Sequence, residues 1–276
     1  MYSLSGKVAL VTGVAGRNGI GRAIAVRLAL EGADIVANDL VDRPSGSGNW
    51  GGLPAIVEEV EALGRRAVAI RADISDAKQV ETMVARALGA FGRIDILVNN
   101  AGAPAGRDRV PVIELEEDAW DLVQRVNVKG TFLCSQAVAR SMIERGGGGR
   151  IINLSSVAGK RGMARFAAYC ASKFAVRGFS QSLALELAPY GITVNAICPV
   201  LVDTERVSEM AAALKPAGVE TETYSREMVE QTTRQIPLGR IAKPDDVARS
   251  AAFLASAEAD YLTGLSFTVA GGFLMD

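Results

Sequence analysis

Histidine does not occur in this sequence of 276 residues. Its absence excludes Ser-His-Asp and Cys-His catalytic triads, and also zinc sites of the HExxH type. If the chain is an enzyme, its protons must move through tyrosine, lysine, carboxylates or a cofactor. Cysteine is scarce as well. Because Cys134, Cys170 and Cys198 form no CxxC pair, we expect neither a bound metal nor a disulfide framework.

An excess of one charge and a long apolar run are also missing. The chain has 30 lysines and arginines against 31 aspartates and glutamates, whereas a nucleic-acid-binding protein normally has a basic excess on one face. No stretch approaches the roughly 18 apolar residues of a membrane span. The first residues lack the basic and then apolar order of a secretory signal. We therefore expect a cytoplasmic protein that binds neither nucleic acid nor a membrane.

The sequence does contain an alternation of short β-branched runs with amphipathic stretches of helical length. The runs are mostly apolar at consecutive positions, as in parallel strands covered on both faces, and they lie at residues 7–12, 34–39, 67–71, 94–98, 150–154, 193–197 and 266–269. The helical patterns lie near residues 20–31, 54–63, 77–90, 116–145, 167–188 and 245–256. This alternation predicts one α/β domain over residues 1–276, a doubly wound parallel sheet with helices on both faces.

Two connections interrupt the alternation. Residues 43–53 form a polar loop rich in glycine and serine between the second expected strand and its helix. Residues 205–235 are long and mixed in charge. Because a long connection in a compact domain is more often functional than idle, we expect residues 205–235 to form a substrate lid.

A glycine-rich turn joins the first expected strand to the first expected helix. Gly13 would allow the sharp turn, Gly19 the close approach of a pyrophosphate, and Gly21 the packing of helix on strand. A tight strand-to-helix connection without a ligand would show similar glycines. The residues expected to contact a dinucleotide here are Gly13, Arg17, Asn18, Gly19 and Ile20.

Asp39 ends the second expected strand, 20 residues after Gly19. At that distance an acidic residue accepts hydrogen bonds from the adenosine ribose hydroxyls of a Rossmann-like site; the alternative is a helix cap or loop aspartate. A carboxylate there repels a 2′-phosphate, which favours NAD over NADP. Arg17, with Arg43 not far along the chain, is the opposing signal, because either could pair with a 2′-phosphate.

Tyr169 and Lys173 lie four residues apart, one turn of a helix from each other. Other motifs support a functional role for this pair. Asn99-Asn100-Ala101-Gly102 follows the fourth expected strand. Asn127 lies within an expected helix, and Ser156 lies 13 residues before Tyr169. Further matching segments are Asn195 to Pro199, Thr204, Pro237 to Arg240 and Thr263-Gly264. In these motifs the sequence resembles the short-chain dehydrogenase/reductase family over essentially its whole length.

The resemblance implies a hydride exchange between nicotinamide and a carbinol carbon. Tyr169 would be the general acid/base, Lys173 would stabilise a phenolate and hold the nicotinamide ribose, and Ser156 would bind the substrate oxygen. Asn127 would hold a water that connects Lys173 to bulk solvent. Each residue also has a structural alternative. Tyr169 could be a packed aromatic and Lys173 a solvated charge. Ser156 could be a strand-end cap and Asn127 a polar group at a helix kink.

The resemblance also assigns the remaining cofactor contacts. They are Asp73 and Ile74 around the adenine, Asn100, Ala101 and Gly102 along the adenosine ribose, and Pro199, Val202 and Thr204 at the carboxamide. For Asp73 the alternative is the N-cap of the next helix. The chain departs from the family pattern in a glycine turn two residues longer than usual and in Val200, which replaces a glycine.

The expected substrate is a small or medium secondary alcohol or its ketone, including diols and acyloins. Its pocket would comprise residues 103–106, Met163, Phe166 and the lid, while Arg161 and Arg165 are expected to be solvated rather than to bind a carboxylate. The alternatives are an NADPH-dependent 3-ketoacyl thioester reductase and a non-catalytic dinucleotide sensor. The helices at 116–145 and 167–188 have broad apolar faces, and the resemblance implies that they pack against other subunits. A homotetramer is expected, with a dimer as the alternative.

Overall fold

The computed structural model describes residues 2–44 and 48–275 and contains one sheet of seven strands in the order β3-β2-β1-β4-β5-β6-β7. All neighbouring strands pair in parallel. The strands are β1 (Val8–Thr12), β2 (Asp34–Asp39), β3 (Ala67–Arg71), β4 (Ile96–Asn99), β5 (Gly149–Leu154), β6 (Ile192–Pro199) and β7 (Ser266–Val269). Every residue of β1, β4 and β6 is buried, which explains their continuous apolar runs.

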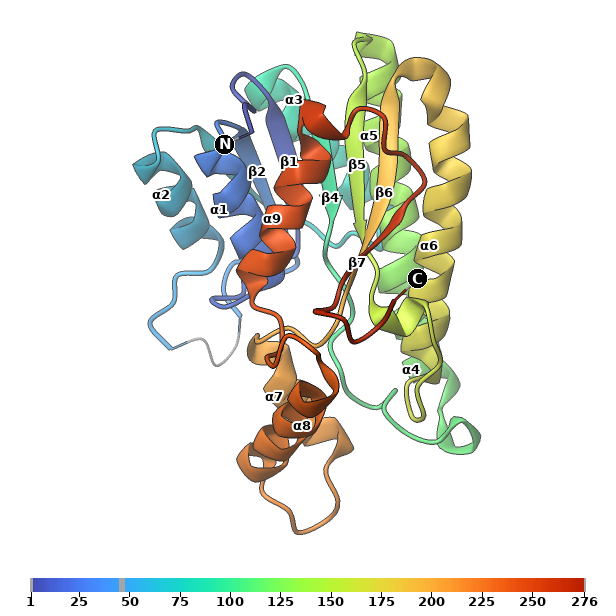
Figure 1. The fold of residues 1–276 in the computed structure, drawn as a ribbon. Helices are drawn as coiled ribbons and strands as arrows, with labels where there is room; N and C mark the ends of the chain where they lie inside the picture. The colour runs from blue at the N-terminus through green and yellow to red at the C-terminus, as the bar shows by residue number, and fades with distance from the viewer. Residues whose placement is uncertain (1, 45–47, 276) are drawn as a thin grey trace.

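Helices cover both faces of the sheet (Figure 1). On one face α1 (Ile20–Leu30), α2 (Leu53–Ala62) and α9 (Pro244–Ala255) enclose one apolar core. On the other face α3 (Ala77–Phe91), α5 (Gly130–Arg145) and α6 (Ala167–Leu187) enclose a second core. The expected doubly wound α/β fold is confirmed. Its strand order reverses between β1 and β4, and in such folds ligands bind where the carboxyl ends of those strands diverge.

The helix expected over residues 116–145 is interrupted. It consists of α4 (Glu117–Gln124), a π-helical turn (Arg125–Lys129) and α5. The predicted helical conformation is present from Glu117 to Arg145, but the π-helical turn in its middle was not predicted. A π-helical turn shifts the helical register by one residue, and such turns occur frequently at functional sites. Here the turn contains Asn127, whose side chain is buried.

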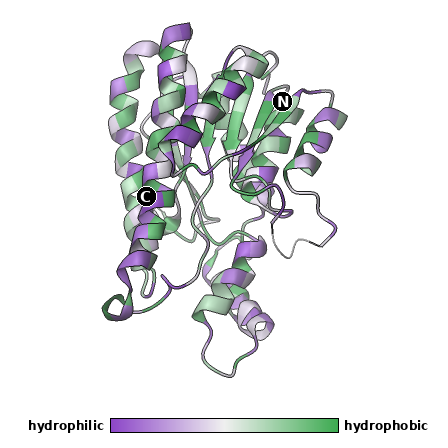
Figure 2. Cartoon of the chain, turned by 180° about the vertical axis from the view of Figure 1, so that it is seen from behind, coloured by the Kyte–Doolittle hydropathy of each residue, from purple (hydrophilic) through white to green (hydrophobic). Residues whose placement is uncertain are grey.

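Residues 205–235 form two helices, α7 (Glu205–Leu214) and α8 (Thr221–Gln235), joined by a short connection. Below, this part is called the α7–α8 segment. It projects beyond the carboxyl edge of the sheet (Figure 1). Val207 and Ala211 of α7 are buried, while α8 buries none of its residues. Figure 2 shows the contrast between the hydrophobic strands and this segment, in which hydrophilic residues are frequent.

The loop expected at residues 43–53 is described only in part, because residues 45–47 lie outside the described residues. The end of this loop contacts the turn between β1 and α1, where Trp50 Nε1 donates to the carbonyl oxygen of Ala15 at 2.7 Å. None of the described helices is long and apolar enough to cross a membrane.

Candidate active site

The glycine turn between β1 and α1 is tightly packed against the end of β4. Gly13 has φ +72°, and a Cβ atom there would lie 2.7 Å from the Cα atom of Ala101. A Cβ atom on Gly21 would overlap the carbonyl oxygen of Gly13. Both positions therefore require glycine for local packing. Helix α1 begins at Ile20 without a side-chain cap and without an acidic residue in its first turn, which leaves its N-terminus suited to bind a phosphate.

Residues within the longer turn connect it to neighbouring elements on either side. The Ala15 N–H donates to Asp39 Oδ2 at 2.9 Å. On the other side, the Asn18 N–H donates to Glu205 Oε1 at 2.7 Å, and Asn18 Nδ2 donates to the carbonyl oxygen of Asp203 at 2.8 Å. A carboxylate of α7 thus binds a backbone amide of the turn that is expected to face a pyrophosphate.

Asp39 lies at the carboxyl end of β2, next to the glycine turn. Its oxygens accept the N–H groups of Ala15 and Leu40, at 2.9 and 2.8 Å. Partial burial raises the pKa of Asp39 above its ordinary value, and these two N–H donors oppose that shift. Each carboxylate oxygen has a further lone pair. The carboxylate beside the turn, the crowded glycines and the open helix N-terminus together fit an adenosine ribose and a pyrophosphate.

Tyr169 and Lys173 lie near the start of α6, next to the carboxyl end of β5. Lys173 is buried, and its Nζ donates to the carbonyl oxygen of Leu154 at 2.7 Å. The same Nζ lies 5.6 Å from the centre of the Tyr169 ring. Burial lowers the pKa of Lys173 to about 7, and the positive charge of Arg206 contributes to this shift.

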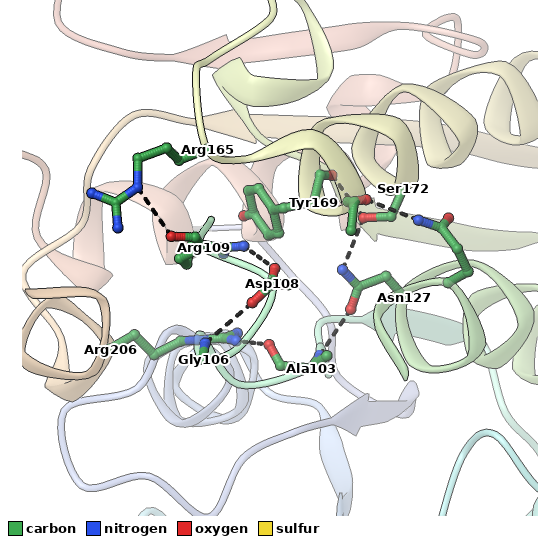
Figure 3. A network of polar contacts seen from close by, with 11 residues as sticks. Ala103, Gly106, Asp108, Arg109, Asn127, Arg165, Tyr169, Ser172 and Arg206 are labelled. Atoms are coloured by element: carbon green, nitrogen blue, oxygen red, sulfur yellow. Dashed lines mark hydrogen bonds and ion pairs between the residues drawn. The ribbon is translucent and has the colours of Figure 1, made fainter. Parts of the chain in front are cut away.

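Ser156 forms a local cap after β5, whereas Asn127 joins two distant segments of the site. Ser156 Oγ accepts the N–H of Ala158 at 3.1 Å, so the serine does form the strand-end cap that was its structural alternative. Its hydroxyl hydrogen is left to donate elsewhere. Asn127 Nδ2 donates to Ser172 Oγ at 2.9 Å, and Asn127 Oδ1 accepts the Ala103 N–H at 2.8 Å (Figure 3). Its side chain thus contacts the residue before Lys173 in the sequence, not Lys173 itself.

The segment after β4 is attached to the glycine turn. Asn100 Nδ2 donates to the carbonyl oxygens of Thr12 and Gly13, at 2.9 and 2.8 Å. The N–H groups of Asn100 and Ala101 both donate to Thr12 Oγ1 at 3.1 Å. Gly102 follows between Asn127 and Arg206: a Cβ atom on it would lie 3.2 Å from Asn127 Oδ1. These residues fix the distance between the ends of β1 and β4.

At the expected adenine end, one sequence alternative is wrong. The N-cap of α3 is Asp76, which accepts the Gln79 N–H at 3.0 Å, and not Asp73. Asp73 instead accepts the Ser75 N–H at 2.8 Å in the turn before the helix. Ile74 is buried, and its side chain lies directly against Gly130.

The expected carboxamide end is formed by residues that follow β6. Pro199 is the last residue of that strand, and Val202 is buried. Thr204 is the N-cap residue of α7, and its hydroxyl donates to the carbonyl oxygen of Val202 at 3.4 Å. Thr204 therefore connects this end of the site directly to the α7–α8 segment.

Four charged residues of the site were not singled out by the sequence, although the last two lie in the expected lid: Asp108, Arg109, Glu205 and Arg206. Asp108 and Arg109 form an ion pair and are each only 3% exposed. The Arg109 guanidinium lies 4.8 Å from the centre of the Tyr169 ring. Arg206 donates to the carbonyl oxygen of Ala103 (Figure 3). No sequence pattern marks these residues, because each obtains its place from contacts between distant segments.

The prediction that Arg165 is solvated was wrong. Arg165 is partly buried, and its guanidinium donates to the carbonyl oxygens of Arg109 and Leu214, at 3.1 and 3.0 Å. Arg161 is exposed, as expected, and its guanidinium lies 4.3 Å from the centre of the Phe273 ring. Arg17 and Arg43 are exposed.

Comparison with known proteins places this geometry in a family. A family model described as Enoyl-(Acyl carrier protein) reductase matches residues 13–274. The chain is 40% identical over 272 residues to a short-chain dehydrogenase/reductase of Armillaria gallica, covering 98% of this chain and 97% of that protein. It is 38% identical to the 2-dehydro-3-deoxy-D-gluconate 5-dehydrogenase of Dickeya dadantii (99% and 97% covered). It is 41% identical to a 3-oxoacyl-(acyl-carrier-protein) reductase of Staphylococcus aureus (98% of each).

A solved structure agrees with these relatives. The crystal structure of carveol dehydrogenase from Mycobacterium avium in complex with NAD matches with a TM-score of 0.88 and 30% sequence identity, covering 100% of both chains. The relationship thus extends over nearly the whole chain in both sequence and fold. The chain belongs to the short-chain dehydrogenase/reductase family, and it is an oxidoreductase of alcohols or ketones that binds a nicotinamide dinucleotide.

Proposed function

We propose that the protein is an NAD-dependent dehydrogenase/reductase that interconverts a small or medium secondary alcohol, such as a diol or acyloin, and its ketone. The observation that carries the proposal is the pairing on α6 of Tyr169 with the buried Lys173, whose Nζ is 5.6 Å from the ring centre. Ser156 follows β5 by two residues and caps the short helical turn after that strand. In a chain without histidine, this cluster supplies the acid and base groups that the reaction needs.

Each residue has a distinct task in this proposal. Tyr169 takes the hydroxyl proton during oxidation and returns it during reduction. Ser156 Oγ accepts the Ala158 N–H, so its hydroxyl hydrogen remains to donate to the substrate oxygen and stabilise the negative charge that develops there. Lys173, with a pKa near neutrality, can gain or release a proton next to the tyrosine. Asn127 keeps α6 and the segment after β4 in register. The nicotinamide, when bound, exchanges a hydride with the carbinol carbon.

Support for NAD over NADP comes from Asp39. Its carboxylate lies beside the glycine turn, where it would accept ribose hydroxyls and repel a 2′-phosphate. The two arginines that could oppose this preference, Arg17 and Arg43, are exposed, and exposed ion pairs contribute little. The related carveol dehydrogenase structure holds NAD.

A second candidate function is an NADPH-dependent 3-ketoacyl thioester reductase. The Staphylococcus aureus relative, which is named for that reaction, favours it. Asp39 opposes it through charge repulsion. A non-catalytic sensor is not retained, because Tyr169 and Lys173 are both present and the relatives are named as enzymes.

We also propose a cytoplasmic homotetramer with a mobile α7–α8 segment as the substrate lid. Apolar side chains are exposed on the outer face of α5 and α6, which supports association through these helices; they are Phe132, Ile143, Phe174 and Leu185. The three cysteines are buried and unpaired, as is usual in a reducing compartment. Thr204 and Arg206 give the α7–α8 segment a direct contact with the site.

The test is reduced-cofactor absorbance with secondary alcohols, diols and a 3-hydroxyacyl thioester, each with NAD⁺ and NADP⁺. Turnover of an alcohol or diol with NAD⁺ is expected. Turnover of the thioester alone, with NADP⁺ alone, would replace the proposal with the second candidate. Binding of neither dinucleotide would contradict both.

A further inference from the structure

The side of Tyr169 away from Asn127 and Ser172 carries a buried guanidinium that the proposed reaction does not use (Figure 3). Arg109 is 3% exposed and lies 4.8 Å from the centre of the Tyr169 ring and 4.5 Å from that of Phe166. Its Nη1 binds Asp108, but its buried Nε has no hydrogen-bond partner among residues 2–44 and 48–275. Buried donors are nearly always satisfied, so an unsatisfied guanidinium nitrogen beside a reacting group indicates a missing acceptor.

Charge around this guanidinium is not balanced. Asp108 also accepts the Gly106 N–H, at 3.1 Å, so its carboxylate is shared with the loop backbone. Arg206 adds a second positive charge, which lowers the pKa of Arg109 further after the larger effect of burial. Arg165, the third arginine, is bound only to backbone carbonyl oxygens in the described contacts. Arg165 and Arg206 thus both contact the segment 103–109 that carries Arg109, and Asp108 is the one carboxylate in that segment.

Three other carboxylates near this edge are engaged elsewhere. Glu205 accepts the Asn18 N–H at the glycine turn. Glu116 and Asp118 bind the exposed Arg107, at 3.0 and 2.6 Å. None of these three carboxylates is therefore available as a second acceptor for the Arg109 guanidinium. An anionic group of the substrate could be that acceptor. Its charge-assisted hydrogen bond would replace the hydration that the guanidinium loses on burial.

We propose, on the basis of the proposed function, that the substrate is a hydroxy acid or its oxo acid, and that Arg109 binds its carboxylate while Tyr169 acts on a carbinol carbon a few bonds away. Arg206, at the start of α7, contacts the same loop through Ala103 and adds a second positive charge to the carboxylate site. Arg165 fixes the geometry by joining the backbone of Arg109 to the end of α7 at Leu214. The carboxylate takes no part in the reaction and serves only to orient the substrate.

The experiment compares substrates that differ only in the charged group. Gluconate is paired with sorbitol, and 3-hydroxybutyrate with 1,3-butanediol, each assayed with NAD⁺ for kcat and KM. We expect the acid of at least one pair to have the larger kcat/KM, by roughly 10- to 100-fold, as for a charge-assisted hydrogen bond. Arg109→Met should remove most of that preference through KM, and Arg109→Lys should retain part of it.

Two controls separate this proposal from misfolding and from the proposed function. Arg161→Met removes an exposed arginine and should keep the preference for the acid. Arg206→Met changes an exposed residue of α7 and should reduce that preference. It leaves the ion pair between Asp108 and Arg109 intact. Unchanged NADH affinity shows that a variant is folded.

Calorimetric binding of gluconate and sorbitol to the NADH complex gives a readout without turnover. Neutral substrates preferred or equal in both assays, or an acid preference that survives in Arg109→Met, would overturn the carboxylate site. Absence of any turnover despite selective gluconate binding would overturn the proposed function alone.

Discussion

Lys173 and Arg109 are two buried basic side chains beside one tyrosine ring, and burial acts on both in the same direction. The pKa of each is lowered, because a low-dielectric surrounding disfavours the charged form. Arginine starts far above neutrality and keeps its charge. Lysine, with a pKa of about 7 here, changes its charge in the range where the enzyme would work. Arg109 is therefore suited to bind an anion, and Lys173 to exchange a proton.

The lowered pKa of Lys173 predicts how stability depends on pH. Its pKa is about 7 in the folded chain against an ordinary value of 10.5, so between these values the unfolded chain binds more protons and stability rises with pH. Relative to Lys173→Met, the wild type should gain up to about 1.4 kcal/mol of unfolding free energy per pH unit there, and roughly 2 to 3 kcal/mol in total from pH 7.5 to 9.5. Urea unfolding of both proteins without cofactor measures the difference. Parallel pH dependence of the two proteins would contradict a buried neutral lysine.

The proposed acid/base role of Tyr169 predicts a loss of rate without a loss of binding. Tyr169→Phe keeps the ring against Phe166 and removes the hydroxyl. We expect kcat to fall by roughly 100- to 10,000-fold, the contribution of a positioned acid/base group, with the NADH dissociation constant within about twofold of the wild type. Tyr190→Phe, at an exposed position, is the matched control. Near-normal turnover in Tyr169→Phe would remove the residue from the mechanism.

At the scale of elements, the sequence predicted the sheet better than the site. Strands at 34–39, 67–71 and 266–269 have the predicted bounds, because each is a short run with β-branched residues between helical or turn segments. The π-helical turn at residues 125–129 was not predicted, since a one-residue shift leaves the apolar spacing of the flanking helices nearly unchanged. Glu205 and Arg109 were missed for another reason. Their partners, Asn18 and Tyr169, are distant in the sequence, and only the fold brings them together.

The contact between α7 and the glycine turn predicts that the Glu205 carboxylate weakens the binding of the dinucleotide. Its carboxylate accepts the Asn18 N–H and would repel an arriving pyrophosphate. Glu205→Gln should therefore lower the NADH dissociation constant, by roughly two- to fivefold, because an exposed charge contributes less than about 1 kcal/mol. Glu209→Gln, one turn further along α7, is the control and should leave the constant unchanged. Weaker NADH binding in Glu205→Gln would show that the carboxylate instead supports the cofactor site.

At the scale of the whole molecule, the two faces of the sheet differ in what they leave exposed. On the side of α5 and α6, Phe174 is 44% and Leu185 is 81% exposed, although both lie on a long helix whose opposite face packs on the sheet. Helices α1 and α9 contact each other closely over the other face and bury most of their apolar residues. A partner is therefore expected on the α5–α6 side, where association would bury the apolar side chains.

This asymmetry predicts the effect of a charge placed on α6. The wild type should sediment at about four times its chain mass of 29.0 kDa, and Leu185→Glu should shift it towards dimers or monomers, because a carboxylate buried in an apolar interface is costly. Leu30→Glu, at an exposed position on the end of α1, is the matched control and should leave the assembly intact. Far-ultraviolet circular dichroism shows whether each variant remains folded. A wild type that sediments as a monomer at micromolar concentration would contradict the tetramer. An unaltered tetramer in Leu185→Glu would move the interface away from this face, since the charge could then not lie between subunits.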